Sequence, residues 1–168
     1  MTLSAVASNG VAPYTVIVHV IEEFGLLLKA AARETERQIN DLLRPLGITA
    51  AQAEALEVLA AREPLSLAEL GGLLVAEGGH PSRLVDRMVA AGLVDRRAAA
   101  DDRRRVELTV TPEGRELGMR AKQVKRSYGA STAAKLDNAS LTAACTALKA
   151  LLHDTPLGAT VTERRQHP

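Results

Sequence analysis

Hydrophobic residues between Tyr14 and Leu43 recur mostly at steps of three and four positions. This period predicts one long helix with an apolar stripe, ended by Pro45 and Gly47. The stripe consists of Ile17, Val20, Ile21, Phe24, Leu27, Leu28, Ala31, Ile39, Leu42 and Leu43. At a rise of 1.5 Å per residue the helix would extend about 45 Å, longer than a domain of this size can cover. We therefore expect part of the stripe to pack against a second chain.

Two short helices are predicted next, each from a hydroxyl residue followed three positions later by a glutamine or glutamate. Thr49 with Gln52 and Ser66 with Glu69 have the spacing of a capping box. In a capping box the two side chains satisfy free amides at the helix start. The first of these helices ends near Pro64, and the second runs to about residue 74.

A third short helix is predicted between Pro81, which suits a first helical turn, and Gly92, which suits a C-terminal cap. Beyond Gly92 the hydrophobic period changes from about 3.6 to about 2. The apolar residues of this stretch are Leu93, Val94, Val106, Leu108 and Val110. Because a period of two is typical of strands, residues 94–110 are predicted to form a hairpin with the charged run 101–105 at its tip.

Two further helices complete the pattern. Thr111 and Pro112 fit the N-cap and first position of a helix that runs to about Ala134, and Asn138 or Ser140 is expected to cap the last helix. The apolar face of that last helix carries Leu141, Ala144, Cys145, Leu148, Leu151 and Leu152. The predicted order is therefore a long helix, three short helices, a hairpin and two helices.

Composition restricts the class of protein. The 168 residues are 46% hydrophobic and 24% charged, which fits one globular domain and excludes a fibrous or disordered chain. Tyr14, Phe24 and Tyr128 are the only aromatic residues, too few for a surface that stacks the bases of single strands. The single Cys145 excludes internal disulfides and favours a reducing compartment. No charge precedes Glu22 and no apolar window reaches about 20 residues, so we expect a cytoplasmic protein.

Positive charge is concentrated in one segment, although the formal net charge is only +1. Residues 80–105 hold seven arginines, four aspartates and no lysine, a net charge of +3. The arginines are Arg83, Arg87, Arg96, Arg97, Arg103, Arg104 and Arg105. Guanidinium groups match phosphate oxygens and guanine edges better than ammonium groups do. An ordinary solvated face can carry the same charge, so the surrounding pattern decides between the two interpretations.

A helix pair followed by a two-stranded hairpin is the plan of a winged helix-turn-helix. In that fold the third helix, here about 80–91, enters the major groove, and the wing, here about 94–110, reaches a flank of the site. Ser82, Arg83, Asp86 and Arg87 form one polar strip on this helix. The residues able to face inward are Leu84, Val85, Met88 and Val89. A plain amphipathic surface helix would show the same strip, but the arginine-rich tip lies where a wing is expected.

Five short motifs occur between Leu46 and Gly114. They are Leu46-Gly47-Ile48-Thr49 with Gln52, Pro64-Leu65-Ser66-Leu67-Ala68-Glu69-Leu70, Ser82-Arg83-Leu84-Val85-Asp86-Arg87-Met88, Gly92-Leu93-Val94 with Arg96, and Asp102-Arg103-Arg104 followed by Thr111-Pro112 and Gly114. In order and spacing they resemble the MarR (multiple antibiotic resistance regulator) family of transcription factors. The resemblance implies an obligate homodimer with interlocked terminal helices that represses or activates transcription on a pseudo-palindromic duplex. Release by a small ligand or by oxidation is common in the family.

The expected fold class is mainly α with a small β-hairpin wing, a winged helix-turn-helix with long N- and C-terminal dimerisation helices. The expected segments are a flexible N-terminal arm (1–12), a dimerisation helix (13–45), a DNA-binding lobe (46–111), C-terminal dimerisation helices (112–154) and a flexible tail (155–168). We expect a repressor that leaves its DNA when a small apolar or phenolic ligand binds.

The resemblance also implies roles for single residues. Ser82, Arg83 and Arg87 would lie on the recognition helix against bases and phosphates. Arg103 or Arg104 would enter the minor groove from the wing tip.

Five further residues are assigned to phosphate contacts or to positioning. Arg97 and Arg105 are expected to contact phosphates. Ser66 would cap the supporting helix, where neighbouring backbone amides can meet a phosphate. Asp86 is expected to orient Arg83, Arg87 or a wing arginine, with solvent exposure as the alternative, and Asp102 to hold the wing arginines.

The start of the recognition helix departs from the family pattern. Relatives usually carry a Ser or Thr cap and small hydroxyl residues there, whereas this chain reads Glu77-Gly78-Gly79-His80-Pro81. Either His80 contacts bases in their place, or it only caps the helix, or Pro81 delays the helix start. The preferred DNA sequence therefore does not carry over from the family.

No sensor site with a defined ligand is evident. Peroxide-sensing relatives use a cysteine near the start of the first helix, which this chain lacks, and Cys145 on its apolar face is expected to be buried and inert. The four histidines are scattered, so no metal or cofactor is expected, although His19 and His153 could meet across the dimer helices. An effector is expected in an apolar crevice between the dimer helices and the DNA-binding lobe.

Enzymatic activity is not expected. The chain has no Gly-Lys-Ser phosphate loop, no Gly-x-Ser-x-Gly elbow and no histidine pair at helical spacing, and no strand precedes Gly78-Gly79. The alternative to a DNA-binding regulator is a winged-helix dimer that contacts only proteins. Affinity for duplex DNA that falls steeply with salt would distinguish the regulator from that alternative.

Overall fold

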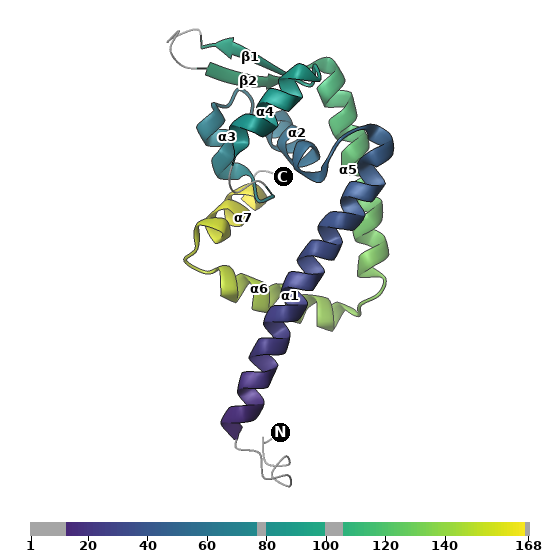
Figure 1. Cartoon of the computed structure of the whole chain (residues 1–168), viewed down its shortest axis with the longest axis vertical. Helices are drawn as coiled ribbons and strands as arrows, with labels where there is room; N and C mark the ends of the chain where they lie inside the picture. The colour runs from purple at the N-terminus through teal and green to yellow at the C-terminus, as the bar shows by residue number, and fades with distance from the viewer. Residues whose placement is uncertain (1–12, 77–79, 100–105, 167–168) are drawn as a thin grey trace. The chain divides into compact units, whose positions relative to one another are not determined.

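The computed structural model describes residues 13–76, 80–99 and 106–166, with side chains from residue 18 onward (Figure 1). The elements are α1 (Pro13–Leu43), the 3-10 helix η1 (Arg44–Leu46), α2 (Ala50–Arg62), α3 (Leu67–Leu73), α4 (Pro81–Ala90), β1 (Val94–Ala98), β2 (Val106–Val110), α5 (Pro112–Ala133), α6 (Asn138–Leu152) and α7 (Pro156–Gln166). The predicted class, mainly helical with one hairpin, is confirmed. The predicted arm at 1–12 lies outside the described residues.

The chain divides into two compact units, residues 1–38 and 39–168, and α1 runs through the boundary between them. In the first unit α1 leaves Val20, Ile21 and Leu27 more than half exposed. None of the helices in the described ranges is both long enough and apolar enough to cross a bilayer. The part of the predicted apolar stripe that lies in this unit is therefore exposed on the single chain.

The ends of α1 and α2 are joined within the second unit. Leu43 is fully buried, and the Asn40 side-chain oxygen accepts the Ala50 N–H at 2.8 Å. Gly47 has φ 72°, a left-handed conformation that glycine adopts without a steric penalty. The chain turns there from η1 into α2.

The two predicted capping boxes are present. The Thr49 hydroxyl accepts the Gln52 N–H and the Gln52 side chain accepts the Thr49 N–H at the start of α2. Ser66 and Glu69 make the same reciprocal pair at the start of α3. Both helix starts were predictable because the satisfying side chains come from the helix's own first turn.

Helix α4 begins at Pro81 and ends before Gly92, as predicted. Gly92 has φ 71°, and the Leu93 N–H donates to the Met88 carbonyl at 2.9 Å. This arrangement is a Schellman-type helix end, which favours glycine at the left-handed position. The chain then enters β1 directly.

The hairpin is antiparallel, with Val94 opposite Val110 and Ala98 opposite Val106. Outside the two strands, Leu65 forms an isolated β-bridge to β2 that the sequence did not indicate. Leu65 and Leu108 exchange two backbone hydrogen bonds, of 3.2 and 2.8 Å. The wing is thereby attached to the connection between α2 and α3.

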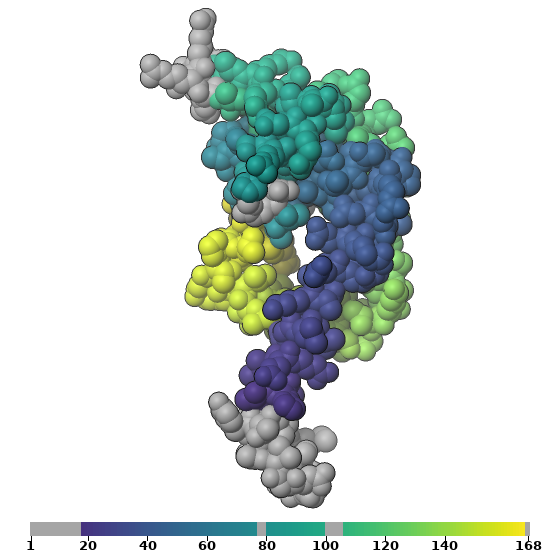
Figure 2. All heavy atoms as spheres, viewed as in Figure 1, coloured from purple at the N-terminus to yellow at the C-terminus, as the bar shows by residue number. Residues whose placement is uncertain are grey.

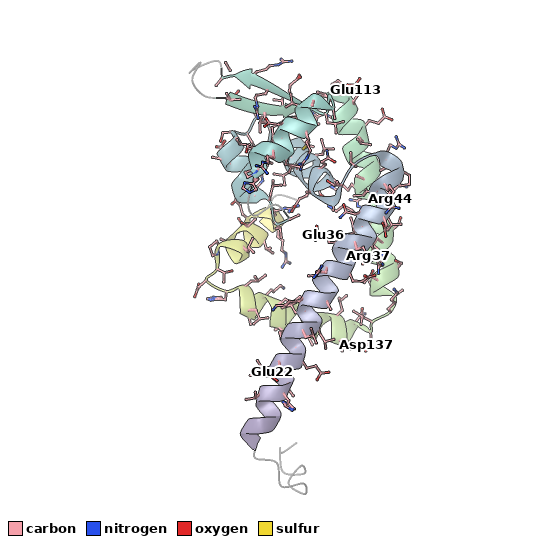
Figure 3. All side chains as sticks on the ribbon, in the orientation of Figure 1. Glu22, Glu36, Arg37, Arg44, Glu113 and Asp137 are labelled. Carbon is pink, nitrogen blue, oxygen red and sulfur yellow. The ribbon has the colours of Figure 1, made fainter. Side chains whose placement is uncertain are left out.

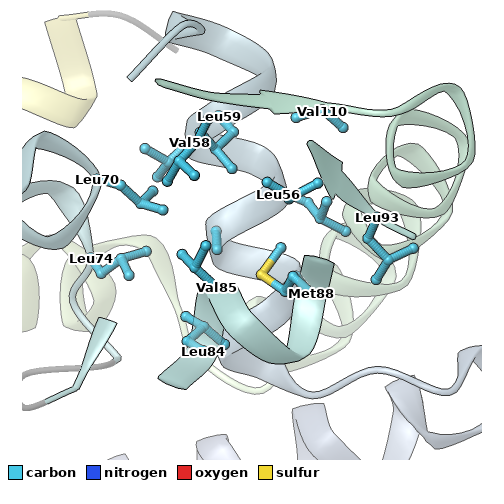
Figure 4. Close-up of a cluster of buried hydrophobic side chains, with 14 of the residues drawn as sticks. Leu56, Val58, Leu59, Leu70, Leu74, Leu84, Val85, Met88, Leu93 and Val110 are labelled. Carbon is cyan, nitrogen blue, oxygen red and sulfur yellow. The ribbon is translucent and has the colours of Figure 1, made fainter. Parts of the chain in front are cut away.

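One aliphatic core fills the lobe, and Figure 4 shows α2, α3, α4 and the hairpin contributing to it. Its fully buried large side chains are Leu43, Leu56, Leu59, Leu70, Leu84, Val85, Met88, Val94 and Leu108. Val89, expected to face inward, is 37% exposed. At 100° per residue it lies at the edge of the strip formed by Leu84, Val85 and Met88.

Helix α5 packs closely against the base of the hairpin. Thr111 caps it by accepting the Gly114 N–H at 3.0 Å and donates its hydroxyl to the Gly92 carbonyl. A Cβ at Gly114 would collide with the Leu93 carbonyl oxygen. Glycine at this position therefore permits the close approach of α5 to the end of α4.

The start of α6 differs from the prediction. Asp137, and neither Asn138 nor Ser140, is the N-cap (Figure 3). Its carboxylate accepts the Ser140 N–H at 2.8 Å, and this hydrogen bond holds the pKa of Asp137 below its ordinary value. Aspartate is a strong cap because its acceptor carries full charge at the positive helix end.

The prediction that Cys145 is buried is wrong for the single chain, because Cys145 is exposed. Helix α6 has no buried residue, and Leu148 and Leu151 on the same apolar face are 39% and 53% exposed. The sequence correctly identified this face of α6 as apolar, but no other part of the described chain covers it.

Residues 155–168 were predicted as a flexible tail, whereas Pro156–Gln166 form the helix α7. Thr155 accepts the Gly158 N–H at 3.1 Å, and Pro156 occupies the first turn, where its missing N–H is tolerated. A Cβ at Gly158 would collide with the Leu152 carbonyl oxygen, so glycine permits the tight turn from α6. Residues 167 and 168 lie outside the described range.

Candidate nucleic-acid interface

The polar strip of α4 faces outward. Ser82, Arg83, Asp86 and Arg87 are all exposed, while the opposite side of the helix is buried in the core. In Figure 2 the teal atoms of α4 and the hairpin lie together at the surface of the lobe. The core thus orients the helix so that its arginines point to solvent.

Asp86 joins this strip to the wing. Its Oδ1 lies 2.9 Å from Nη2 of Arg96 on β1, and the two side chains are 62% and 38% exposed. An exposed pair of this kind contributes about 0–1 kcal/mol to stability. Its main effect is to restrict where α4 and β1 lie relative to each other. Of the partners considered for Asp86, the structure shows a wing arginine.

Arg97 belongs to the other face of β1. Residues 95 and 97 point to one side of the strand and residue 96 to the opposite side, and Arg97 Nη2 pairs with Asp95 Oδ2 at 2.9 Å. Arg97 is 75% exposed. A phosphate at this position would compete with Asp95 for the guanidinium group.

The two helix starts near the interface are built differently. The His80 side chain is exposed and makes no capping hydrogen bond, and its carbonyl accepts the Arg83 N–H at 3.1 Å. At α3, Ser66 donates its N–H to Glu69 at 2.7 Å. The amides that remain for a phosphate are therefore those of Leu67 and Ala68, which have no intrahelical acceptor.

The remaining predicted interface residues, Asp102, Arg103, Arg104 and Arg105, lie outside the described residues. The flanking strands end at Ala98 and begin at Val106. The structure therefore describes the base of the wing but not its tip.

Glu63 anchors the base of the wing from behind, a role that the sequence did not indicate. Its Oε2 accepts the Val110 N–H of β2 at 2.6 Å, and its Oε1 accepts a hydrogen bond from Arg115 of α5. Burial opposes ionisation of Glu63, but the Arg115 and Val110 hydrogen bonds outweigh burial and hold its pKa below the ordinary value. These partners lie 47 and 52 positions away, so no local pattern could reveal them.

Two crevices border α5. One, of about 310 Å³, lies between α2, α5 and Arg164 of α7. Its lining includes Leu56, Met119, Arg62, Arg115 and Lys122. The other, of about 600 Å³, is lined by Leu42, Leu46, Arg120, Val124 and Tyr128, among others. Both volumes suit small molecules, and charged side chains at both places make them less apolar than expected.

No metal site appears among the described residues, where no three potential ligands gather. His19 lies 3.7 Å from Glu22, and His153 lies 2.8 Å from Asp154. His19 and His153 are thus each close to an acidic residue that is near in sequence.

Similar proteins of known role are transcriptional regulators. The profile of the MarR family matches residues 46–105. The chain is 30% identical over 112 residues to the HTH-type transcriptional repressor Mb2911 of Mycobacterium bovis, which covers 67% of this chain and 81% of the relative. It is 34% identical over 95 residues to the organic hydroperoxide resistance transcriptional regulator of Bacillus subtilis, which covers 56% of this chain and 65% of that protein.

A solved structure shows a similar arrangement. A cysteine-to-serine mutant of MarR from E. coli, complexed with operator DNA, matches with a TM-score of 0.71 and 27% identity. The match covers 79% of this chain and 95% of that one.

Several curated relatives, including the B. subtilis regulator, are matched over slightly less than two thirds of their own length.

Proposed function

Because the chain belongs to the MarR family of transcriptional regulators, we propose that it is a homodimeric, sequence-specific repressor that binds a pseudo-palindromic duplex. Helix α4 enters the major groove and the hairpin reaches the adjacent minor groove. The family and the relatives named above are regulators of transcription rather than enzymes.

The proposal rests on two exposed arginines of α4. Arg83 and Arg87 are exposed on the side of α4 opposite its buried residues, and within the described chain neither forms an ion pair. Arg96 and Arg97, in contrast, are already paired with aspartates. The two α4 guanidinium groups are therefore available for the phosphates and guanine edges that arginine contacts by preference.

The other assigned residues take supporting roles. Ser82 contacts the DNA beside the two arginines, and Arg103 or Arg104 enters the minor groove. Arg97 and Arg105 bind phosphates. Asp86 positions the wing through Arg96, and the amides that follow Ser66 meet a phosphate.

A second copy supplies the other half of the site. The exposed apolar residues of α1 and α6 give each chain a surface that a second chain can cover. In a two-fold dimer, recognition helices about 34–36 Å apart contact half-sites one helical turn from each other. A small ligand bound in a crevice beside α5 would change that separation and release the DNA.

Selection of bound duplexes from a random pool, with the DNA upstream of the protein's own gene included, tests the proposal. The expected result is enrichment of an inverted repeat with half-sites 10–10.5 base pairs apart, centre to centre. If the pool returns without an enriched sequence, the chain is instead a winged-helix module for protein contacts.

A further inference from the structure

A buried carboxylate lies behind the DNA-binding surface. Glu54, in the middle of α2, is only 7% exposed, and its neighbours Ala53, Ala55 and Leu56 belong to the apolar core. A buried charge is costly unless it is hydrogen-bonded and paired. Glu54 therefore needs partners, and the structure supplies three.

Two of these partners are consecutive backbone amides. Glu54 Oε1 accepts the Val75 N–H at 3.1 Å, and Oε2 accepts the Ala76 N–H at 2.9 Å. Both amides belong to the connection between α3, which ends at Leu73, and the recognition helix, which begins at Pro81. The Val75 side chain is 43% exposed, so its packing does little to fix the backbone. Glu54 thus holds the backbone of the two residues that follow buried Leu74 at the end of α3.

The third partner comes from α7. Arg164 Nη1 pairs with Glu54 Oε1, and the two side chains are 25% and 10% exposed. Arg164 supplies the positive charge that compensates the buried carboxylate. Without it, Glu54 would keep two neutral donors and no ion-pair partner among the described residues.

Helix α7 is held against the lobe by two other contacts. Arg62 of α2 donates to the Glu163 carboxylate at 2.5 Å and to the Glu163 carbonyl at 2.8 Å. The Thr160 hydroxyl donates to the carbonyl of Gly72 in α3 at 2.9 Å. These contacts place α7 across α2 and α3, and Arg164 is thereby directed at Glu54.

We propose that Glu54 and Arg164 are positioning residues for the recognition helix, and that α7 braces the α3–α4 connection through them. This inference rests on the proposed DNA-binding function. Glu54 holds the amides of Val75 and Ala76, and Arg164 holds the Glu54 carboxylate in place. Neither residue contacts DNA in this proposal.

Amide hydrogen exchange on the full-length chain tests the brace without DNA. Arg164→Ala is expected to accelerate exchange at Val75 and Ala76 while the amides in the middle of α5 stay unchanged. Arg165→Ala is the matched control, because Arg165 lies next in sequence and is exposed. Arg164→Lys retains the charge and is expected to restore part of the protection. Equal exchange at Val75 and Ala76 in wild type and Arg164→Ala would overturn the proposal.

Binding to the duplex selected by wild type gives the second measurement. Arg164→Ala is expected to bind about tenfold more weakly, which corresponds to the competent arrangement of α4 falling to about a tenth of the population. Because Arg164 touches no phosphate, the dependence of log affinity on log salt should keep its slope, whereas loss of a phosphate contact lowers that slope by about 1. A lowered slope would contradict a positioning role.

A double variant tests whether the two residues act together. If Arg164 works through Glu54, then Glu54→Gln with Arg164→Ala should lose no more affinity than the weaker-binding single variant. Additive losses would overturn the proposal. If wild type selects no duplex, the proposed DNA-binding function fails. The exchange experiment uses no DNA, so it still shows whether Arg164 and Glu54 hold the Val75 and Ala76 amides.

Discussion

The arginines of the predicted interface differ in what they already contact. The sequence identified the arginine cluster and the outward strip of α4, because composition and helical period are local properties. It could not show that Arg96 pairs with Asp86 and Arg97 with Asp95, since a side chain's partner depends on how α4 and β1 meet in space. The paired and unpaired arginines therefore lead to different predictions.

Substitution of the unpaired arginines should weaken specific DNA binding. Arg83→Ala or Arg87→Ala is expected to cost about 1–3 kcal/mol and to relax sequence preference at the base contacted. Titration of each variant against the selected duplex and against single-base variants of it measures both effects. Arg165→Ala is again the control. Unchanged affinity in one α4 variant would remove that arginine from the interface.

Glu63 predicts a pH dependence of stability. Its pKa is lower in the folded chain than its ordinary value of 4.5, so its contribution is complete above about pH 4.5 and is lost as the pH falls through the lowered value. At pH 7, Glu63→Gln should cost about 1.5–3 kcal/mol, the range for a hydrogen bond to a charged group.

Urea unfolding at pH 7 and at low pH measures this contribution. The difference between wild type and Glu63→Gln should shrink at low pH, because both side chains are then neutral. Glu116→Gln on the exposed side of α5 is the control and should have little effect at either pH. A difference that stays constant with pH would exclude the ionised Glu63 as the anchor of β2.

The helices and strands were predictable where their signals are local. The caps at Thr49, Ser66 and Thr111 and the turn at Gly92 each use side chains or backbone angles within a few residues. The bridge at Leu65 depends on a contact with a distant segment, so the hydrophobic pattern gave no sign of it. Helix α7 has a local start signal in Thr155 and Pro156, but its position on the lobe depends on contacts with distant residues. Arg62 and Glu163, for example, are 101 positions apart.

Two glycines of α5 give opposite predictions. Gly114→Ala should destabilise the chain by about 1–3 kcal/mol, the typical cost of overpacking, because its Cβ would meet the Leu93 carbonyl. Gly129 has no atom within 4 Å of an added Cβ, so Gly129→Ala should stabilise by about 0.5–1 kcal/mol through helix propensity. Thermal unfolding of both variants shows whether each substitution lowers or raises the stability of the fold. A stable Gly114→Ala variant would contradict the close approach of α5 to the hairpin base.

Two helices of the described chain, α1 and α6, leave apolar side chains exposed. The length of α1 and its apolar stripe already indicated a second chain, because a 31-residue helix extends about 46 Å. The structure adds that α6 also exposes its apolar face, Cys145 included. That exposure was not predictable from the α6 sequence alone, since the same pattern fits a helix buried within one chain.

A charge introduced into the α1 stripe should disrupt the proposed dimer. Leu27 is 59% exposed on the single chain, so Leu27→Glu should leave each chain folded but shift dimers to monomers and reduce operator affinity. Sedimentation at several protein concentrations measures the shift, with Glu23→Gln on the same helix as control. A wild-type chain that sediments as a monomer while binding an inverted repeat would contradict the interlocked dimer.

The most direct test is the affinity of the full-length protein for its selected duplex and for a scrambled duplex of equal composition, measured across salt concentrations. The account predicts tighter binding of the selected duplex at every salt concentration. It also predicts that log affinity falls linearly with log salt, by about 0.9 for each phosphate contacted. Equal affinity for the two duplexes, or binding that does not change with salt, would contradict the assignment of α4 and the wing to DNA.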